Sequence, residues 1–122
     1  MNRAVLRQLK ALCPGCLIRV EWYDASIGKS RRSSIDVPAL SYGIYLGLLG
    51  EMNKHIVLCQ NSFKFMNGMY DVDYTAVPLD WSVKVTLIKN AEVSREVAQH
   101  LLDSFLAGRN RTLKRRANNH GS

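Results

Sequence analysis

The sequence predicts a mainly β fold: a five-stranded small antiparallel barrel with a short N-terminal helix and a C-terminal helix. Hydrophobic residues alternate with polar ones over much of residues 16–88, and turn-forming residues separate the resulting short runs. No long helical segment interrupts these runs, which favours a small barrel over a βαβ arrangement. A chain of 122 residues, 47% of them hydrophobic, is sufficient for one core.

The first predicted element is an amphipathic helix over residues 3–12. Its apolar positions recur at helical spacing, and basic residues occupy other positions of the helical wheel. The apolar residues are Val5, Leu6, Leu9 and Leu12, and the basic residues are Arg3, Arg7 and Lys10. Cys13-Pro14-Gly15 ends the helix, because proline disfavours helical geometry in the residue before it. The spread of charge also differs from a secretory signal, in which charge precedes an unbroken apolar run.

The first predicted strand covers residues 16–23, where Ile18, Val20 and Trp22 share one face and polar residues the other. A polar, basic loop follows at residues 24–36. Residues 42–49 and 55–58 are β-prone runs joined by a turn at 50–54, so they are expected to pair antiparallel. After a connection containing Asn67-Gly68, the remaining strands are residues 72–77 and 82–88, with a corner at Pro78-Leu79-Asp80.

Residues 90–107 return to helical spacing and present one broad apolar face. Ser94 or Asn90 is expected to cap the start of this helix and Gly108 its end. The domain prediction is one small-barrel domain with flanking helices over residues 1–107, followed by a basic, disordered tail over residues 108–122. The residues of the apolar face are Val93, Val97, Ala98, Leu101, Leu102, Phe105 and Leu106.

Positive charge is concentrated at the C-terminal end. The formal net charge is +7, and residues 108–122 contribute five basic residues and no acid, so the remainder carries only +7 − 5 = +2. Such a segment can neutralise phosphates and release counterions without reading a base sequence. We therefore expect a non-enzymatic protein that binds RNA or DNA. The predicted contacts are Arg109, Arg111, Lys114, Arg115 and Arg116, with Lys29, Arg31 and Arg32 of the basic loop adding a second contact.

Aromatic residues offer a second means of binding single strands, because bases stack on exposed rings. Aromatic residues in strands also occupy cores, so only those on the surface would serve. The candidates are Trp22, Tyr42, Tyr45, Tyr70 and Tyr74.

Residues 15–89 resemble the Sm-like family and, more loosely, SH3-like barrels. The matching segments are Pro14-Gly15 before the strand IRVEW, the run GIYLGL at residues 43–48, NKHIVL at 53–58 and VPLDWSVKVTLI at 77–88. The resemblance implies a strongly bent strand and its hairpin partner, in which glycine lets the chain turn. The family's base-binding aspartate and asparagine correspond at best to Glu51 and Asn53. Its arginine-glycine turn is replaced by Leu79-Asp80-Trp81.

No pattern predicts a metal site, a cofactor or an enzyme. Cys13-x-x-Cys16 has the spacing of half a zinc site, but His55 and Cys59 in a strand would lie about 13 Å apart, too far to complete it. A redox CxxC pair normally begins a helix, whereas this one ends a helix. Gly28-Lys29-Ser30 lacks the first glycine of a phosphate loop, because Tyr23 stands there. The histidines show no catalytic triad pattern.

An odd set of three cysteines fits a reducing compartment, and no run of about 18 apolar residues is present. We therefore expect a cytoplasmic protein that does not enter a membrane. The alternative function is a structural or adaptor protein, for instance of a virus or mobile element, whose helices bury their apolar faces in a homo-oligomer or a partner. The two functions overlap, because small barrels often oligomerise before they bind nucleic acid.

Overall fold

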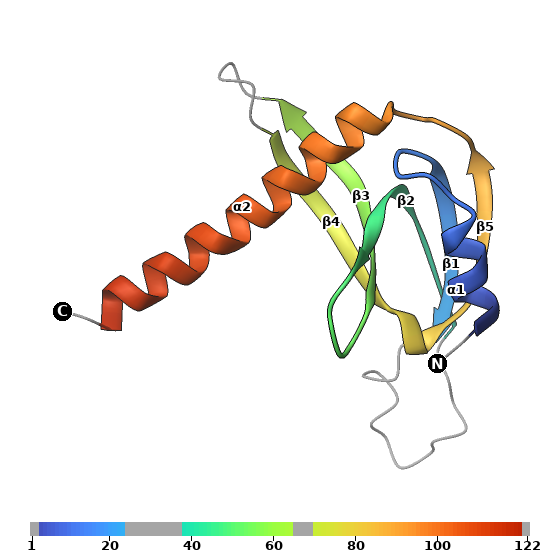
Figure 1. The fold of residues 1–122 in the computed structure, drawn as a ribbon, viewed down its shortest axis with the longest axis horizontal. Coiled ribbons are helices and arrows are strands. Elements are labelled where there is room, and N and C mark those ends of the chain that lie inside the picture. Colours follow the sequence, from blue (N-terminus) through green and yellow to red (C-terminus); the bar gives the residue numbers. More distant parts are fainter. Residues whose placement is uncertain (1–2, 24–37, 65–69, 121–122) are drawn as a thin grey trace, which may run out of the picture.

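The computed structural model describes residues 3–23, 38–64 and 70–120, with side chains described except at 63–64, 70–71 and 108–120. Five antiparallel strands form one sheet, in the order β4-β3-β2-β1-β5, and two helices flank it (Figure 1). This confirms the predicted mainly β class. The elements are α1 (Arg3–Lys10), β1 (Leu17–Tyr23), β2 (Pro38–Leu49), β3 (His55–Lys64), β4 (Tyr70–Pro78), the 3₁₀ turn η1 (Leu79–Trp81), β5 (Ser82–Lys89) and α2 (Arg95–His120).

The sheet is open, so the closed barrel expected from the sequence is not found. Within the described ranges β4 and β5 are the two edges and are not hydrogen-bonded to each other. The physical reason is visible at β5: the backbone N–H of Val85 donates to Oε1 of Gln8 at 3.1 Å. A side chain of α1 thus takes a bond that a closing strand would need.

Each sheet face has its own core. On one face, Val5 and Leu9 of α1 cover a cluster that includes Ile18, Val20 and Ile56. On the other face, helix α2 packs over β2 and β4. Its buried side chains there are Ala98, Leu101 and Phe105, and they contact Leu46, Val57 and Cys59. Residues 56–59 of β3 are buried on both faces, which explains their unbroken apolar run.

A β-bulge in β2 shifts the alternation of its side chains, so that Leu46 and Leu48, two residues apart, enter different cores. The pairing with β3 shifts between Tyr45 and Gly47, where Gly47 has a φ of +148° that glycine adopts without strain. Tyr45 packs in the core under α1, and Leu46 packs in the core under α2. Past the bulge, Leu48 joins the α1 core.

Helix α2 begins as expected and ends later than expected. The Ser94 hydroxyl accepts the N–H of Val97 at 3.1 Å, which confirms Ser94 as the cap. The prediction that Gly108 ends the helix is wrong, because the backbone remains helical to His120. A single glycine costs a helix only about 1 kcal/mol, and residues 109–120 contain no proline to stop it. No described helix is long and apolar enough to cross a membrane.

Candidate nucleic-acid interface

The structure locates the predicted phosphate contacts only in part. Lys29, Arg31 and Arg32 lie outside the described residues. The other five basic positions, at 109–116, lie on the helical backbone of α2, and their side chains are outside the described set. They therefore belong to a helical segment continuous with the docked part of α2.

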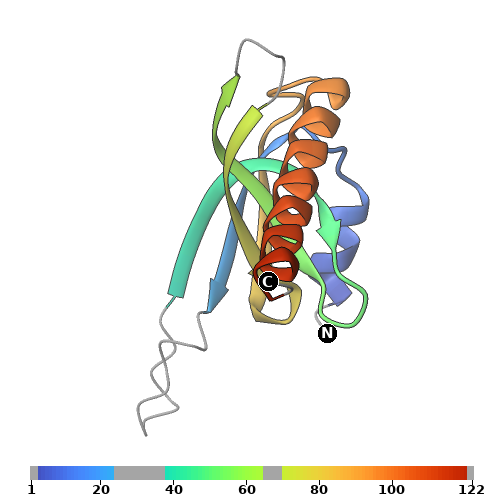
Figure 2. The same ribbon diagram turned by 90° about the vertical axis from the view of Figure 1, so that its left-hand side faces the viewer.

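The C-terminal part of α2 projects beyond the sheet. Figures 1 and 2 show the helix crossing the sheet and ending on the side away from β5. A helix of 26 residues is about 39 Å long, longer than the roughly 30 Å of the nine-residue strand β4 that it crosses. Its inner half is anchored by Phe105, whose ring meets that of Tyr74 at a centroid distance of 4.0 Å in an edge-to-face arrangement.

A second candidate surface lies on the sheet face that carries α2, over the part of β2, β1 and β5 where side chains are exposed. Arg19 pairs with Tyr42 on one side and with Thr86 on the other, and Glu21 pairs likewise with Leu40 and Lys84. Cross-strand partners point to the same face of a sheet. We call the resulting set the open sheet face; it consists of Arg19, Glu21, Leu40, Tyr42, Lys84 and Thr86.

Tyr42 is the aromatic residue that the open sheet face presents to solvent, with 48% of its surface exposed. Tyr45 is buried in the α1 core, and Tyr74 packs on Phe105. Trp22 stacks on Trp81 and donates its indole N–H to the Ser41 hydroxyl at 2.9 Å. Tyr70 has no described side chain. Of the five aromatic residues considered from the sequence, Tyr42 therefore best fits a stacking role.

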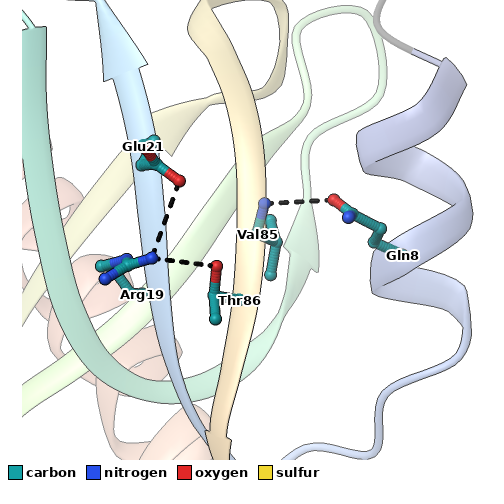
Figure 3. Close-up of polar contacts among 5 residues, drawn as sticks. All are labelled: Gln8, Arg19, Glu21, Val85 and Thr86. Carbon is teal, nitrogen blue, oxygen red and sulfur yellow. Dashed lines mark hydrogen bonds and ion pairs between the residues drawn. The ribbon is translucent and has the colours of Figure 1, made fainter.

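Arg19 is the cross-strand partner of Tyr42, and Figure 3 shows its side chain between Glu21 and Thr86. Its Nη2 donates to the Thr86 hydroxyl at 3.4 Å and lies 3.9 Å from Oε2 of Glu21. Its Nε is buried and has no hydrogen-bond partner in the described part of the molecule. Because the Arg19 side chain is only 34% exposed and is bonded to Thr86, its guanidinium is restrained over β1 and β5.

Beside Glu21 and Leu40, the open sheet face borders a shallow hollow of about 80 Å³. Glu21 and Leu40 line it together with Trp22, Tyr23 and Val83. Tyr23, Leu40 and Val83 are exposed apolar side chains. The hollow extends the apolar surface beyond Tyr42. Glu21 is the charged residue in its lining.

Cys16 and Cys59 do not converge. Cys16 is buried in the core under α1, whereas Cys59 is buried on the opposite sheet face under α2. Desolvation raises the pKa of both thiols, which disfavours the thiolate that metals and electrophiles require. Across residues 3–23, 38–64 and 70–120, no group of three or more histidine, cysteine or acidic side chains could hold a metal ion.

Comparison of the chain with protein-family models, curated proteins and solved structures finds no match. The candidate site therefore rests on the geometry of this chain alone. Sequence reasoning had singled out Tyr42 but missed Arg19, Leu40 and Lys84. The signal for Arg19 and Lys84 was present as the polar half of two alternating strands, whereas Leu40 preceded the predicted strand at residues 42–49. The pairing that joins the three depends on register across a long connection.

Proposed function

We propose that the protein is a non-enzymatic nucleic-acid-binding protein of the Sm-like type, with an open sheet in place of a closed barrel, that holds single-stranded RNA or DNA. One observation carries this proposal: the exposed ring of Tyr42 lies beside Arg19 on an uncovered part of the sheet. A tyrosine ring stacks on any base, and a neighbouring guanidinium adds cation–π and phosphate contacts.

The spacing of the open sheet face suits a single strand. Neighbouring strands are about 4.8 Å apart, and side chains on one face repeat about every 6.6 Å along a strand. Tyr42 and Leu40 therefore offer successive contacts to an extended chain of bases. Arg19 is the cross-strand partner of Tyr42, and Lys84 lies on the next strand, opposite Glu21. Glu21 forms an ion pair with Arg19.

The basic residues supply sequence-independent affinity in this proposal. Arg109, Arg111, Lys114, Arg115 and Arg116 lie on the part of α2 that extends past the sheet, where a polyanion can approach. Each phosphate they neutralise releases counterions, which makes the affinity fall steeply with salt. Lys29, Arg31 and Arg32 belong to the proposal as a further contact.

Assignment to the Sm-like type is supported by three features of the chain path. Strand β2 bends at a glycine bulge, β2 and β3 form a hairpin, and a three-residue turn joins β4 to β5. These match what the resemblance implies for the bent strand and the last two strands. The base-binding loop residues of the family have no close counterpart, so the proposal places base contacts on the open sheet face instead.

The test is fluorescence anisotropy with labelled single strands of about 20 nucleotides, both RNA and DNA, at about 50 to 500 mM salt. Tyr42→Ala should weaken binding about 5- to 150-fold, the loss of one stacked base. Truncation after Gly108 should make the affinity less dependent on salt concentration. Met52→Ala, at a side chain 94% exposed in the β2–β3 turn, is the matched control. Unchanged affinity in both the Tyr42 and the truncated variants, or no binding by the full chain, contradicts the proposal.

The alternative candidate is a structural protein that acts as a homo-oligomer. Two observations favour it: β5 is a sheet edge, and it carries the exposed apolar residues Val83, Leu87 and Ile88. An exposed apolar edge strand pairs readily with another chain. Light scattering and native mass spectrometry should detect assemblies that Ile88→Lys reduces. A monomer at high concentration, with no partner recovered by pull-down, would reject this candidate.

A further inference from the structure

Cys13, Pro14, Gly15 and Cys16 form a tight turn between α1 and β1. Proline occupies the second position, and Gly15 the third with a φ of +106°, the combination that a type II β-turn requires. The N–H of Cys16 points to the carbonyl oxygen of Cys13 at 3.4 Å. In such a turn the first and fourth Cα atoms lie closer than about 7 Å, which falls within reach of a disulfide.

The two thiols differ in access. Cys13 is exposed, whereas Cys16 is 2% exposed and packs in the core under α1. Both are free cysteines. An oxidant in solution therefore meets Cys13 first, and Cys16 is the neighbouring thiol that can resolve the product.

Hydrogen bonds hold the turn in place on two sides. The N–H of Gly15 donates to the Tyr45 carbonyl at 2.8 Å, and the Tyr45 N–H donates to the Cys16 carbonyl at 2.9 Å. The Val93 N–H, just before α2, donates to the Gly15 carbonyl at 3.0 Å. A turn fixed in this way loses little further freedom when its ends are joined.

We propose that Cys13 and Cys16 are a disulfide-forming site that reacts with low-molecular-weight disulfides such as oxidised glutathione. The Cys13 thiolate attacks one glutathione sulfur and expels a glutathione thiolate. The Cys16 thiolate then attacks the Cys13 sulfur and expels the second one. The two protein thiols lose two protons and two electrons, and one glutathione disulfide is reduced to two glutathione molecules.

Closure of this disulfide locks the junction that joins three elements. The turn contacts β2 through Tyr45 and the entry to α2 through Val93. Cross-linking restricts the unfolded chain and makes opening of this junction rarer. The site is a staple and not an oxidoreductase centre, because the pair follows helix α1 and has no helix N-terminus to stabilise a thiolate.

The experiment equilibrates the full-length protein with mixtures of reduced and oxidised glutathione and measures intact mass, followed by alkylation of the denatured protein. The expected product is two hydrogens lighter, is restored by dithiothreitol, and melts on the order of 5 °C higher. Cys59→Ser, at a buried thiol on the opposite sheet face, should behave like wild type. Cys13→Ser should abolish the mass change and the shift in Tm.

Two outcomes overturn the proposal. One is accumulation of a stable glutathione adduct on Cys13 while Cys16 remains free to alkylate after denaturation. The other is a closed product whose Tm equals or falls below that of the reduced protein, which would mean that the bond distorts the turn. Neither outcome depends on nucleic-acid binding, so the two proposals fail or stand separately.

Discussion

The side-chain oxygen of Gln8 accepts the backbone N–H of Val85 at 3.1 Å and ties α1 to the free edge of β5 (Figure 3). Edge strands expose unpaired backbone groups that other chains can bond. Here a glutamine from the N-terminal helix satisfies one of them, while Val5 and Leu9 on the same helix bury their side chains. The helix thus protects the edge as well as the core.

Gln8→Ala should destabilise the fold by about 1–2 kcal/mol, because it leaves the Val85 N–H without its partner. It should also increase self-association, since this part of the β5 edge is freed. Urea unfolding followed by circular dichroism measures the first effect and light scattering the second. Lys10→Ala, on an exposed position of the same helix, is the control. Equal midpoints for the two variants would show that the bond contributes nothing.

Leu101→Ala should destabilise the protein by about 2–5 kcal/mol, because Leu101 is 1% exposed in the core between α2 and the sheet. Leu106→Ala, at a side chain 38% exposed five residues further on, should cost much less. The comparison is made by urea unfolding. Similar losses for both would mean that α2 does not dock through the described face.

The sequence predicted the apolar face of α2 and the presence of five strands well, because each depends on local periodicity, but it did not predict where α2 docks. The alternation at Ile18, Val20 and Trp22 and the spacing of Leu101 and Phe105 are signals of this kind. Strand ends were less predictable. Strand β2 begins at Pro38, because pairing with β1 and not residue preference recruits residues 38–41. Sheet closure is a property of the whole chain, and no local pattern reports it.

Gly15→Ala should be strongly destabilising, by more than about 1 kcal/mol. The backbone φ of +106° is unfavourable for alanine, and an added Cβ would lie 2.5 Å from the Val93 carbonyl oxygen. The loss should include the entry to α2, so hydrogen exchange at Val93 should accelerate. Asn53→Ala, on the exposed β2–β3 turn, is a suitable control. Exchange at Val93 as slow as in wild type would contradict the prediction.

Stability should decline in alkaline solution. Burial raises the pKa of the Cys16 and Cys59 thiols above their ordinary value of 9.0, and burial likewise raises the pKa of Tyr45 above 10.0. Above about pH 9 the unfolded chain releases protons that the folded chain retains, so rising pH favours unfolding. Below about pH 9, the protonated Cys16, Cys59 and Tyr45 side chains make their full contribution to the stability of the fold.

The measurement is the urea midpoint at about pH 8 to 11 under reducing conditions. Replacing both buried thiols, as Cys16→Ala with Cys59→Ala, should flatten the decline, because only Tyr45 of the three groups then remains. A decline equally steep in this variant would assign the effect to other groups.

The candidate interface was less predictable than the fold. Tyr42 was among five aromatic candidates, and the exposed face could not be told from the buried one before register was known. In the sequence, Arg19 is an ordinary solvent-facing position of an alternating strand. Only the strand register shows that it lies between Tyr42 and Thr86. The basic residues at 109–116 were identified by composition alone. Composition did not predict that their backbone is helical.

The bulge at Leu46 gives β2 one residue more than its pairing with β3 requires. Removing Leu46 would leave the flanking residues in regular alternation opposite the same β3 partners, so Leu48 and Leu49 would keep their cores and the core under α2 would lose one buried leucine. A one-codon deletion there should thus cost no more than a large-to-small substitution in this core, about 2–5 kcal/mol. Among related chains, one-residue gaps should therefore be found at the bulge as well as in the turn at residues 50–54.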